Sequence, residues 1–239
     1  MKNQRIDKLL ANSGFGSRSE VRLLIKSGKV IVNNKLIKDV DFKVDADSDE
    51  ICVTGKILNY NEFVYYMLNK PAGVVSATND NTCKTVLELL HVHNKDLFPV
   101  GRLDKDTEGL LIITNDGPLA HDLLSPKKHI DKTYYVKTDK EITDEMAEIL
   151  EKGVDIGEEK LTLPARIELI YENHIAKEAM LTITEGKFHQ VKRMFKAVGL
   201  NVTFLKRISM GKLLLDESLK PGEYRALTES EISLLKNRD

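Results

Sequence analysis

The sequence is poor in cysteine and has no long apolar run. Its 239 residues include two cysteines, Cys52 and Cys83, which form no CxxC pair. We therefore expect neither a disulfide scaffold nor a cysteine-based zinc site. No apolar stretch approaches the roughly 20 residues that cross a bilayer, and the first ten residues lack the apolar core of a signal peptide. These absences predict a cytoplasmic protein without membrane contact.

The glycine-rich fingerprints of dinucleotide-binding and P-loop proteins are also missing. Three histidines are candidate metal ligands, because a His-x-His pair can chelate: His91, His93 and His189. No acidic or cysteine residues accompany them in a ligand pattern, so structural or surface roles are expected. We predict no metal and no cofactor.

Charge is unevenly distributed along the chain. The net charge is −1, but residues 1–38 hold nine Lys and Arg against two acids, a local charge of +7 that leaves −8 on the other 201 residues. A basic terminal segment on an acidic body indicates contact with a polyanion. A solvated charged surface is the alternative interpretation. The length suits one small domain and one larger one.

Two helical patterns lie near the N-terminus. The first ends at Gly14. The second begins with the capping box Ser17-x-x-Glu20, and Gly28 stands where a helix C-cap is expected. The apolar positions of the two patterns are Ile6, Leu9, Leu10, Val21, Leu24 and Ile25.

Short strands follow these helices. The run VIVNNKLI predicts two strands around a tight turn at Asn33-Asn34, and residues 51–53 predict another. A linker is expected around residues 55–62. We therefore place a domain boundary between residues 58 and 59, with domains at 1–58 and 59–239.

The stretch RIDKLLANSGFGSRSEVRLLIKSGKVIVNNKLI resembles the S4 RNA-binding domain. In that family the two helices and the following turn present basic side chains to structured RNA. The resemblance implies a domain that binds phosphates and docks a folded RNA while reading little sequence. For each residue alone, an exposed helix charge is a competing interpretation. The RNA contacts that the resemblance to the S4 domain implies are Arg5, Ser17, Arg18, Arg22, Lys26 and Lys29.

Residues 59–239 contain strands in runs rather than in strict alternation with helices. Helical patterns are expected at 143–150 and 187–198, and Thr228-x-x-Glu231 is a capping box for a terminal helix. This order predicts an α+β fold with a mixed, mostly antiparallel sheet flanked by helices. The expected strands are FVYYMLNK, GLLIITN, TYYVKT, ARIELI, AMLTIT and NVTFLKRI.

The stretch GRLDKDTEGLLIITNDG, residues 101–117, has a polar turn before a strand that is apolar on both faces. A buried strand fixes the loop before it, so a carboxylate in that loop is well placed for catalysis. Spacing alone does not choose among Asp104, Asp106 and Glu108. A solvated acidic loop remains the alternative.

Five segments, in chain order, resemble the motifs of the RsuA and RluA-type pseudouridine synthases. They are NKPAGVVSAT, GRLD with TEGLLIITNDG, KTYYV, EGKFHQVKRMF and PGEYRALTESEI. With the S4-like start, the resemblance covers almost the whole chain. It implies a pseudouridine synthase catalytic domain, which isomerises a uridine of RNA to pseudouridine without a cofactor.

The resemblance makes Asp104, the acid of GRLD, the essential carboxylate. The reaction breaks the N1–C1′ bond, turns the uracil and joins C5 to C1′. A charged Asp104 either attacks C1′ as a nucleophile or removes the 2′ proton to give a glycal, and the sequence leaves both open. Tyr134 is implied to stack on the uracil or to assist proton removal, with a core tyrosine as its alternative.

A cation is expected beside Asp104, because burial alone raises the pKa of a carboxyl group. The resemblance favours Lys192 over its neighbour Arg193, which lies about 100° away around a helix and would contact RNA. Arg102 resembles the arginine that helps to hold a flipped nucleotide. A surface ion pair or an exposed basic face is the alternative for these residues.

The segments SPKKHIDKTYYV and EGKFHQVKRMFKAVG resemble the small-subunit type, RsuA, more than its large-subunit relatives. The implied partner is 16S ribosomal RNA, with uridine 516 as the target. The alternatives are a 23S rRNA-directed relative, a noncatalytic RNA-binding or ribosome-assembly factor, and a small-molecule glycosidase, which would need paired carboxylates. We expect a monomer.

Overall fold

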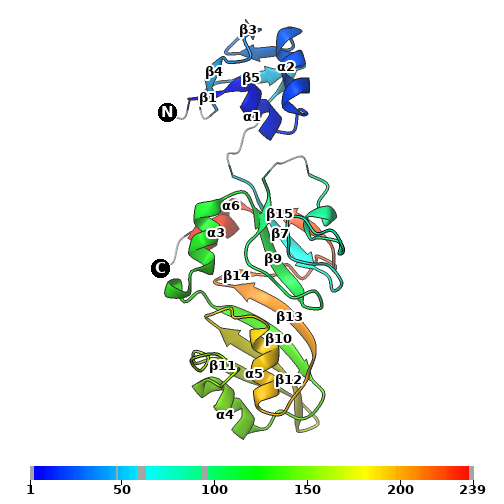
Figure 1. The fold of residues 1–239 in the computed structure, drawn as a ribbon, viewed down its shortest axis with the longest axis vertical. Coiled ribbons are helices and arrows are strands. Elements are labelled where there is room, and N and C mark those ends of the chain that lie inside the picture. The colour runs from blue at the N-terminus through cyan, green and yellow to red at the C-terminus, as the bar shows by residue number, and fades with distance from the viewer. Residues whose placement is uncertain (1–2, 47, 59–62, 93–95, 237–239) are drawn as a thin grey trace. The chain divides into compact units, whose positions relative to one another are not determined.

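The computed structural model describes residues 3–46, 48–58, 63–92 and 96–236 (Figure 1). These residues form two compact units. The first runs to Val64 and includes the described part of 91–97, and the second holds 65–90 and the residues from Phe98 onward. The domain boundary predicted at 58/59 adjoins residues 59–62, which lie outside the described part, so it stays a prediction.

The first unit packs two helices against short strands. Strand β1 pairs with β4, and the others form a sheet in the order β3-β2-β5-β6. The core consists of aliphatic side chains from both helices and the strands. The elements are β1 (Asn3–Arg5), α1 (Ile6–Asn12), α2 (Arg18–Lys26), β2 (Val30–Val32), β3 (Lys35–Ile37), β4 (Lys43–Asp45), β5 (Ile51–Val53) and β6 (Lys56–Ile57).

Local signals in this unit are confirmed, with one correction. The backbone N–H of Ser17 donates to the Glu20 carboxylate (2.7 Å), and the N–H of Glu20 donates to the Ser17 hydroxyl (3.3 Å). Asn33 and Asn34 have φ of 48° and 63°, as a tight hairpin turn requires. The expected linker is wrong at Lys56–Ile57, because this segment turns back and pairs with β5 as β6.

The second unit is built on one sheet. Its strands are β7 (Tyr65–Lys70), β8 (Phe98–Pro99), β9 (Glu108–Thr114), β10 (Lys132–Thr138), β11 (Arg166–Glu172), β12 (Ile175–Ile183), β13 (Val202–Met210), β14 (Leu213–Leu214) and β15 (Tyr224–Ala226). The order is β11-β12-β10-β13-β9-β7-β15, with β14 on β13 and β8 on β9. Within the described residues, β13 and β9 form the one parallel pair, so the prediction of a mixed, mostly antiparallel sheet is confirmed.

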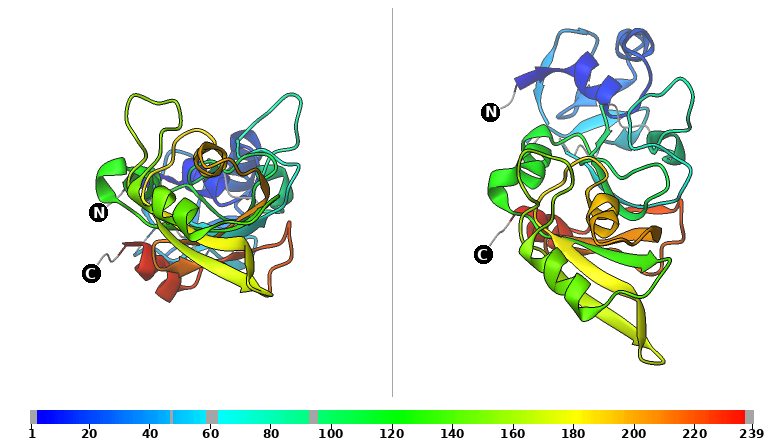
Figure 2. Two further views of the ribbon diagram at one scale, coloured as in Figure 1. Left: turned by 90° about the horizontal axis from the view of Figure 1, so that it is seen from below. Right: turned by 60° about the horizontal axis from the view of Figure 1, so that its bottom comes forward.

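Helices complete the second unit, and α5 covers one face of the sheet (Figure 2). All six expected strands are present. Thr143, the first residue of the helical pattern predicted at 143–150, caps α4, and α6 begins at the predicted capping box of Thr228. The helices are α3 (Gly117–Leu124), α4 (Asp144–Lys152), α5 (Gln190–Ala197) and α6 (Glu229–Lys236), with 3-10 turns η1 (Leu87–Leu89) and η2 (Pro126–Lys128).

Two helices differ from expectation. Helix α5 begins at Gln190 rather than at residue 187, because His189 adopts the left-handed conformation with φ 49°. Helix α3 was not predicted from the sequence. The Asp116 carboxylate caps it by accepting from the backbone N–H of Leu119 (3.0 Å), and Pro118 occupies its first turn.

No helix in the described part of the chain combines the length and the apolar composition needed to cross a membrane.

Candidate active site

The loop that carries Asp104 is held by the segment that follows β7. We call residues 101–107 the GRLD loop. The hydroxyl of Ser76 donates to the carbonyl of Leu103 (2.9 Å) and accepts from its N–H (3.0 Å). The N–H of Gly73 donates to the carbonyl of Lys105 (2.7 Å). The NKPAGVVSAT motif therefore fixes the backbone on which Asp104 stands.

Lys70, at the end of β7, is fully buried and braces the same loop. Its ammonium group donates to the carbonyls of Thr107 (2.7 Å), Pro71 (3.0 Å) and Lys105 (3.3 Å). Burial lowers the pKa of Lys70 to about 8, and the negative charge of Asp106 offsets this only in part. Sequence reasoning gave Lys70 no role, although a lysine that ends an otherwise apolar strand is a usable signal.

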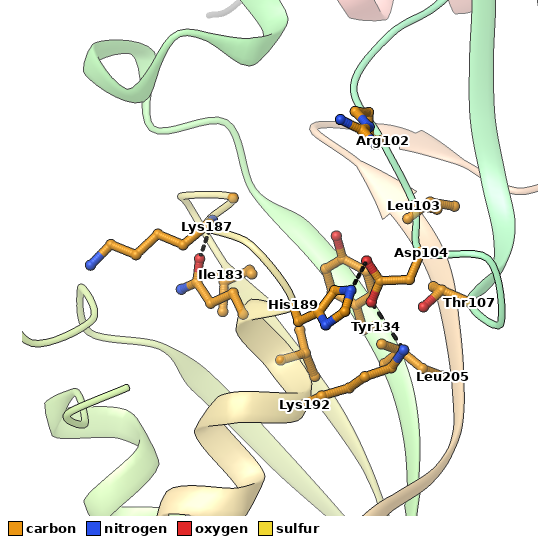
Figure 3. A pocket seen from close by; sticks show the side chains of 13 residues that line it. Arg102, Leu103, Asp104, Thr107, Tyr134, Ile183, Lys187, His189, Lys192 and Leu205 are labelled. Carbon is orange, nitrogen blue, oxygen red and sulfur yellow. Dashed lines mark hydrogen bonds and ion pairs between the residues drawn. The ribbon is translucent and has the colours of Figure 1, made fainter. Parts of the chain in front are cut away.

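Asp104 forms an ion pair with Lys192, which α5 supplies (Figure 3). The Nζ of Lys192 lies 3.0 Å from Oδ2 of Asp104 and 2.5 Å from Oδ1 of Asp106. The Nε2 of His189 lies 3.5 Å from the other oxygen of Asp104. Both Asp104 and Lys192 are about three-quarters buried, whereas the Asp106 side chain is 73% exposed.

The ion pair keeps Lys192 protonated. Burial alone would lower the pKa of Lys192, but its hydrogen bonds to Asp106 and Asp104 outweigh burial and raise that pKa. The hydrogen bond from Lys192 in turn lowers the pKa of Asp106. A cation therefore stands permanently beside the Asp104 carboxylate.

Arg193 has other partners. Its guanidinium donates to Glu158 (2.8 Å), to the carbonyl of Phe188 (3.0 Å) and to the carbonyl of Ile156. Of the two basic candidates, the structure thus brings Lys192 and not Arg193 to Asp104. An RNA contact by Arg193 remains a prediction.

Tyr134 lies beside Asp104 in the close view of the site (Figure 3). It is 8% exposed and points to the buried face of β10. Its neighbour Tyr135 is on the opposite face, where its hydroxyl bonds to Glu178, as strand alternation predicts.

Two cavities meet at this point, of about 70 and about 630 Å³. The larger one falls in the range of roughly 300–1,000 Å³ typical of small-molecule sites, so it has room for a nucleotide base and sugar. Arg102 is exposed and lines both cavities, and its side chain lies apart from Asp104 (Figure 3). The residues shared by the two linings are Arg102, Leu103, Asp104, Tyr134, Gly186, Lys187 and His189.

In the first unit, two candidate RNA contacts are held by one buried acid. Asp7 is 2% exposed. It accepts from Arg5 (2.9 and 3.0 Å) and from Nε of Arg22 (3.2 Å), and Arg5 also pairs with Asp41. The hydrogen bond from Arg5, helped by Arg22, outweighs burial and lowers the pKa of Asp7. Sequence reasoning counted Asp7 only as an acid and missed this role.

The other RNA candidates of the first unit are exposed: Ser17, Arg18, Lys26 and Lys29. The Ser17 hydroxyl is engaged in the capping box. Across the described residues, no three His, Cys, Asp or Glu side chains gather as a metal site; His93 lies outside those residues.

Known proteins are similar to this chain over nearly its full length. The family model described as RNA pseudouridylate synthase matches residues 64–197, and the S4 domain model matches residues 4–51. An uncharacterized RNA pseudouridine synthase of Bacillus subtilis is 53% identical, covering 97% of this chain and 98% of its own. The ribosomal small subunit pseudouridine synthase A of Vibrio cholerae is 44% identical, covering 96% and 98%. A solved pseudouridylate synthase structure aligns with a TM-score of 0.68 at 36% identity, covering 97% and 99%.

Proposed function

Because this chain belongs to the family of RNA pseudouridine synthases and carries an S4 domain, we propose that it isomerises one uridine of 16S ribosomal RNA, with uridine 516 as the candidate. The observation that carries the proposal is the Asp104–Lys192 ion pair beside Tyr134 at a cavity of about 630 Å³. The small-subunit choice is supported by the similarity to the Vibrio cholerae protein, whose name specifies that subunit.

In this proposal the target uridine leaves its helix and enters the cavity, since a stacked base cannot react. The Asp104 carboxylate meets the ribose and either attacks C1′ or takes the 2′ proton. Lys192, which donates to Oδ2 of Asp104, places a positive charge beside that oxygen in a partly buried site. The ring of Tyr134 packs against the base, and Arg102 at the exposed edge contacts the RNA strand.

The S4 domain docks the RNA by its phosphates. The exposed basic side chains on and after α2, together with Arg5, supply the positive charge. The proposed contacts are Arg5, Ser17, Arg18, Arg22, Lys26 and Lys29. Because one chain supplies Asp104, Tyr134 and Lys192, a monomer suffices for the reaction.

The test maps pseudouridines across the rRNA of cells that lack this protein and of cells complemented with the wild type or with Asp104→Asn. We expect one modification of 16S rRNA to disappear and to return only with the wild type. Loss of a 23S modification instead would assign the chain to the large subunit. Unchanged modification of both rRNAs would refute the ribosomal substrate.

A further inference from the structure

A buried arginine outside the ion pair lines the larger cavity. Arg207, on β13, is 2% exposed. Its Nε donates to the carbonyl of Leu110 (2.8 Å), but its buried Nη2 has no hydrogen-bond partner in the part of the chain that the structure describes. A buried donor without an acceptor is costly and uncommon, and a guanidinium stays charged at every physiological pH. The vacant donor therefore points to a partner that arrives with the substrate.

The backbone holds Arg207 next to the reacting centre. In the β10–β13 ladder its Cα is the partner of the Cα of Tyr134, and both side chains line the cavity that Asp104 also lines. On its other side, β9 approaches so closely that a Cβ at Gly109 would lie 2.3 Å from the carbonyl oxygen of Arg207. Arg207 is thus fixed between the strand of Tyr134 and the strand that follows the GRLD loop.

Three other charged groups in or beside the cavity have partners. Lys192 serves Asp104. Lys132 is buried and donates to the carbonyls of Ile130 (2.8 Å) and Thr184 (3.5 Å). Glu185 accepts from Nε2 of Gln190 (2.7 Å) and from the N–H of Leu163 (2.9 Å). Arg207 and Lys132 therefore both line the cavity as positive charges, and neither is paired with Asp104.

The reaction creates an anion in this cavity by either route. When the N1–C1′ bond breaks, its electron pair stays on the uracil, which becomes negatively charged at N1 and on its carbonyl oxygens. On the sugar, C1′ accepts a lone pair from the Asp104 carboxylate, or the C2′–H pair forms a C1′=C2′ double bond while Asp104 takes the proton. The base then turns and C5 bonds to C1′, while the C1′–O bond to Asp104 breaks or, on the glycal route, Asp104 returns its proton to C2′. The C5 proton then leaves and N1 takes up a proton. A fixed donor acts most strongly on developing charge where water is excluded, and Arg207 is buried.

We propose that Arg207 binds a carbonyl oxygen of the flipped uracil and stabilises the negative charge that the base carries once it is detached. The inference rests on the proposed function, because it needs a uridine in the cavity. A phosphate oxygen of the RNA is the other acceptor of the same chemistry. The burial of Arg207 beside Tyr134 favours the base.

The test compares RNA that carries uridine at the target with RNA that carries 5-fluorouridine, under single turnover. Fluorine withdraws electrons and stabilises the detached base by itself, so the fluorinated base depends less on an outside donor. We expect Arg207→Gln to slow conversion of uridine by about 100-fold, as loss of one such donor does in other enzymes, and to slow cleavage of 5-fluorouridine much less. The rate of Arg207→Lys on uridine RNA should lie between the rates of the wild type and of Arg207→Gln. The RNA affinity of both variants should equal that of the wild type.

The matched control is Arg225→Gln. Arg225 is a partly buried arginine with full partners in Asp216 and Glu231, and it lines neither cavity; its loss should lower stability and leave both rates unchanged. Wild-type rates in a folded Arg207→Gln protein, or equal losses on the two substrates, would overturn the inference. A loss of RNA affinity alone would assign Arg207 to a phosphate. If Arg207→Gln does not fold, Arg207→Lys carries the same comparison. A wild-type enzyme inactive on the uridine RNA would instead refute the proposed substrate.

Discussion

Lys192 and Asp104 lie 88 positions apart in the chain, yet Nζ of one is 3.0 Å from Oδ2 of the other. The sheet brings them together, since the GRLD loop precedes β9 and α5 precedes β13, the parallel neighbour of β9. Arg193, the next residue, is occupied by Glu158 and two carbonyls. Of these two neighbouring basic residues, only Lys192 is therefore the partner of Asp104.

Replacing the carboxylate should remove activity and spare binding. Asp104→Asn keeps the shape of the side chain but lacks the charge that either route requires, so pseudouridine formation should fall by about 10⁴-fold or more. RNA affinity in a filter-binding titration should stay near that of the wild type. An Asn variant that still modifies RNA would contradict the assignment of Asp104.

Replacing the cation should also act on the rate. Lys192→Met leaves the Asp104 charge unpaired, and we expect a loss of about 10²- to 10³-fold in kcat, the usual effect of removing one electrostatic partner. Lys192→Arg should recover part of it, because the charge is retained in a different geometry. The control is Arg193→Met, whose rate should fall much less. Equal losses in the two Met variants would argue against a specific role for Lys192.

Removing the hydrogen bonds that Lys70 makes to the GRLD loop and to Pro71 should lower both the stability and the reaction rate. Lys70→Met introduces an uncharged side chain of similar length and leaves three carbonyl groups without their donor. We expect a loss of about 1–3 kcal/mol in the free energy of unfolding by urea, with a slower single-turnover reaction. The control Lys152→Met removes a surface lysine paired with Glu148, and its stability should change by less than about 0.5 kcal/mol. Wild-type stability of Lys70→Met would contradict the role of Lys70.

In the S4 domain, removing a negative charge should weaken binding to a polyanion. Asp7→Asn releases Arg5 and Arg22 from the acid that orients them, so RNA affinity should fall by about tenfold, or about 1.4 kcal/mol. Net charge alone predicts the opposite. Glu50→Gln removes an exposed acid of the same unit and should leave affinity unchanged or slightly higher. Similar affinities of the two variants would reject the orienting role, provided that thermal melts show both folded.

Acid should destabilise the catalytic domain partly through Glu231. Arg225 donates to both of its carboxylate oxygens (2.7 and 2.8 Å) and lowers the pKa of Glu231 to about 2 from an ordinary 4.5. A carboxyl group with a depressed pKa stabilises the fold fully above its unfolded pKa, and this contribution is lost as pH falls through the folded pKa. The wild-type Tm should therefore drop more steeply between pH 4.5 and pH 2 than the Tm of Glu231→Gln. Parallel curves would contradict this contribution.

Apolar patterns predicted the sheet well, because the buried positions of β7, β9 and β10 are mostly occupied by apolar residues. The boundaries of α5 were less accessible, since a left-handed residue such as His189 leaves no mark in hydrophobic periodicity. The choice among Asp104, Asp106 and Glu108 came from family resemblance alone. The structure gives that ambiguity a physical basis, because Lys192 contacts both Asp104 and Asp106.

The partners of polar residues that become buried through tertiary contacts were not predictable. Lys70, Arg207 and Asp7 read as ordinary charged positions, and their partners are backbone carbonyls or side chains from other segments. A pattern of residue types does not show which carbonyl a distant loop presents. The RNA-contact candidates of α2 came from the resemblance to the S4 domain, and helical spacing adds only that Arg18, Arg22 and Lys26 lie on neighbouring turns.

The parallel contact between β9 and β13 spans only two registered positions, Lys206 with Glu108 and Arg207 with Gly109. On one side of this narrow join stands the strand that anchors the carboxylate loop, and on the other stand the strands that bear the aromatic ring and the buried guanidinium. The pairing that keeps the sheet continuous therefore also keeps the residues of the proposed active site aligned. A change that separates β9 from β13, even far from the RNA, would therefore abolish activity before the protein unfolds.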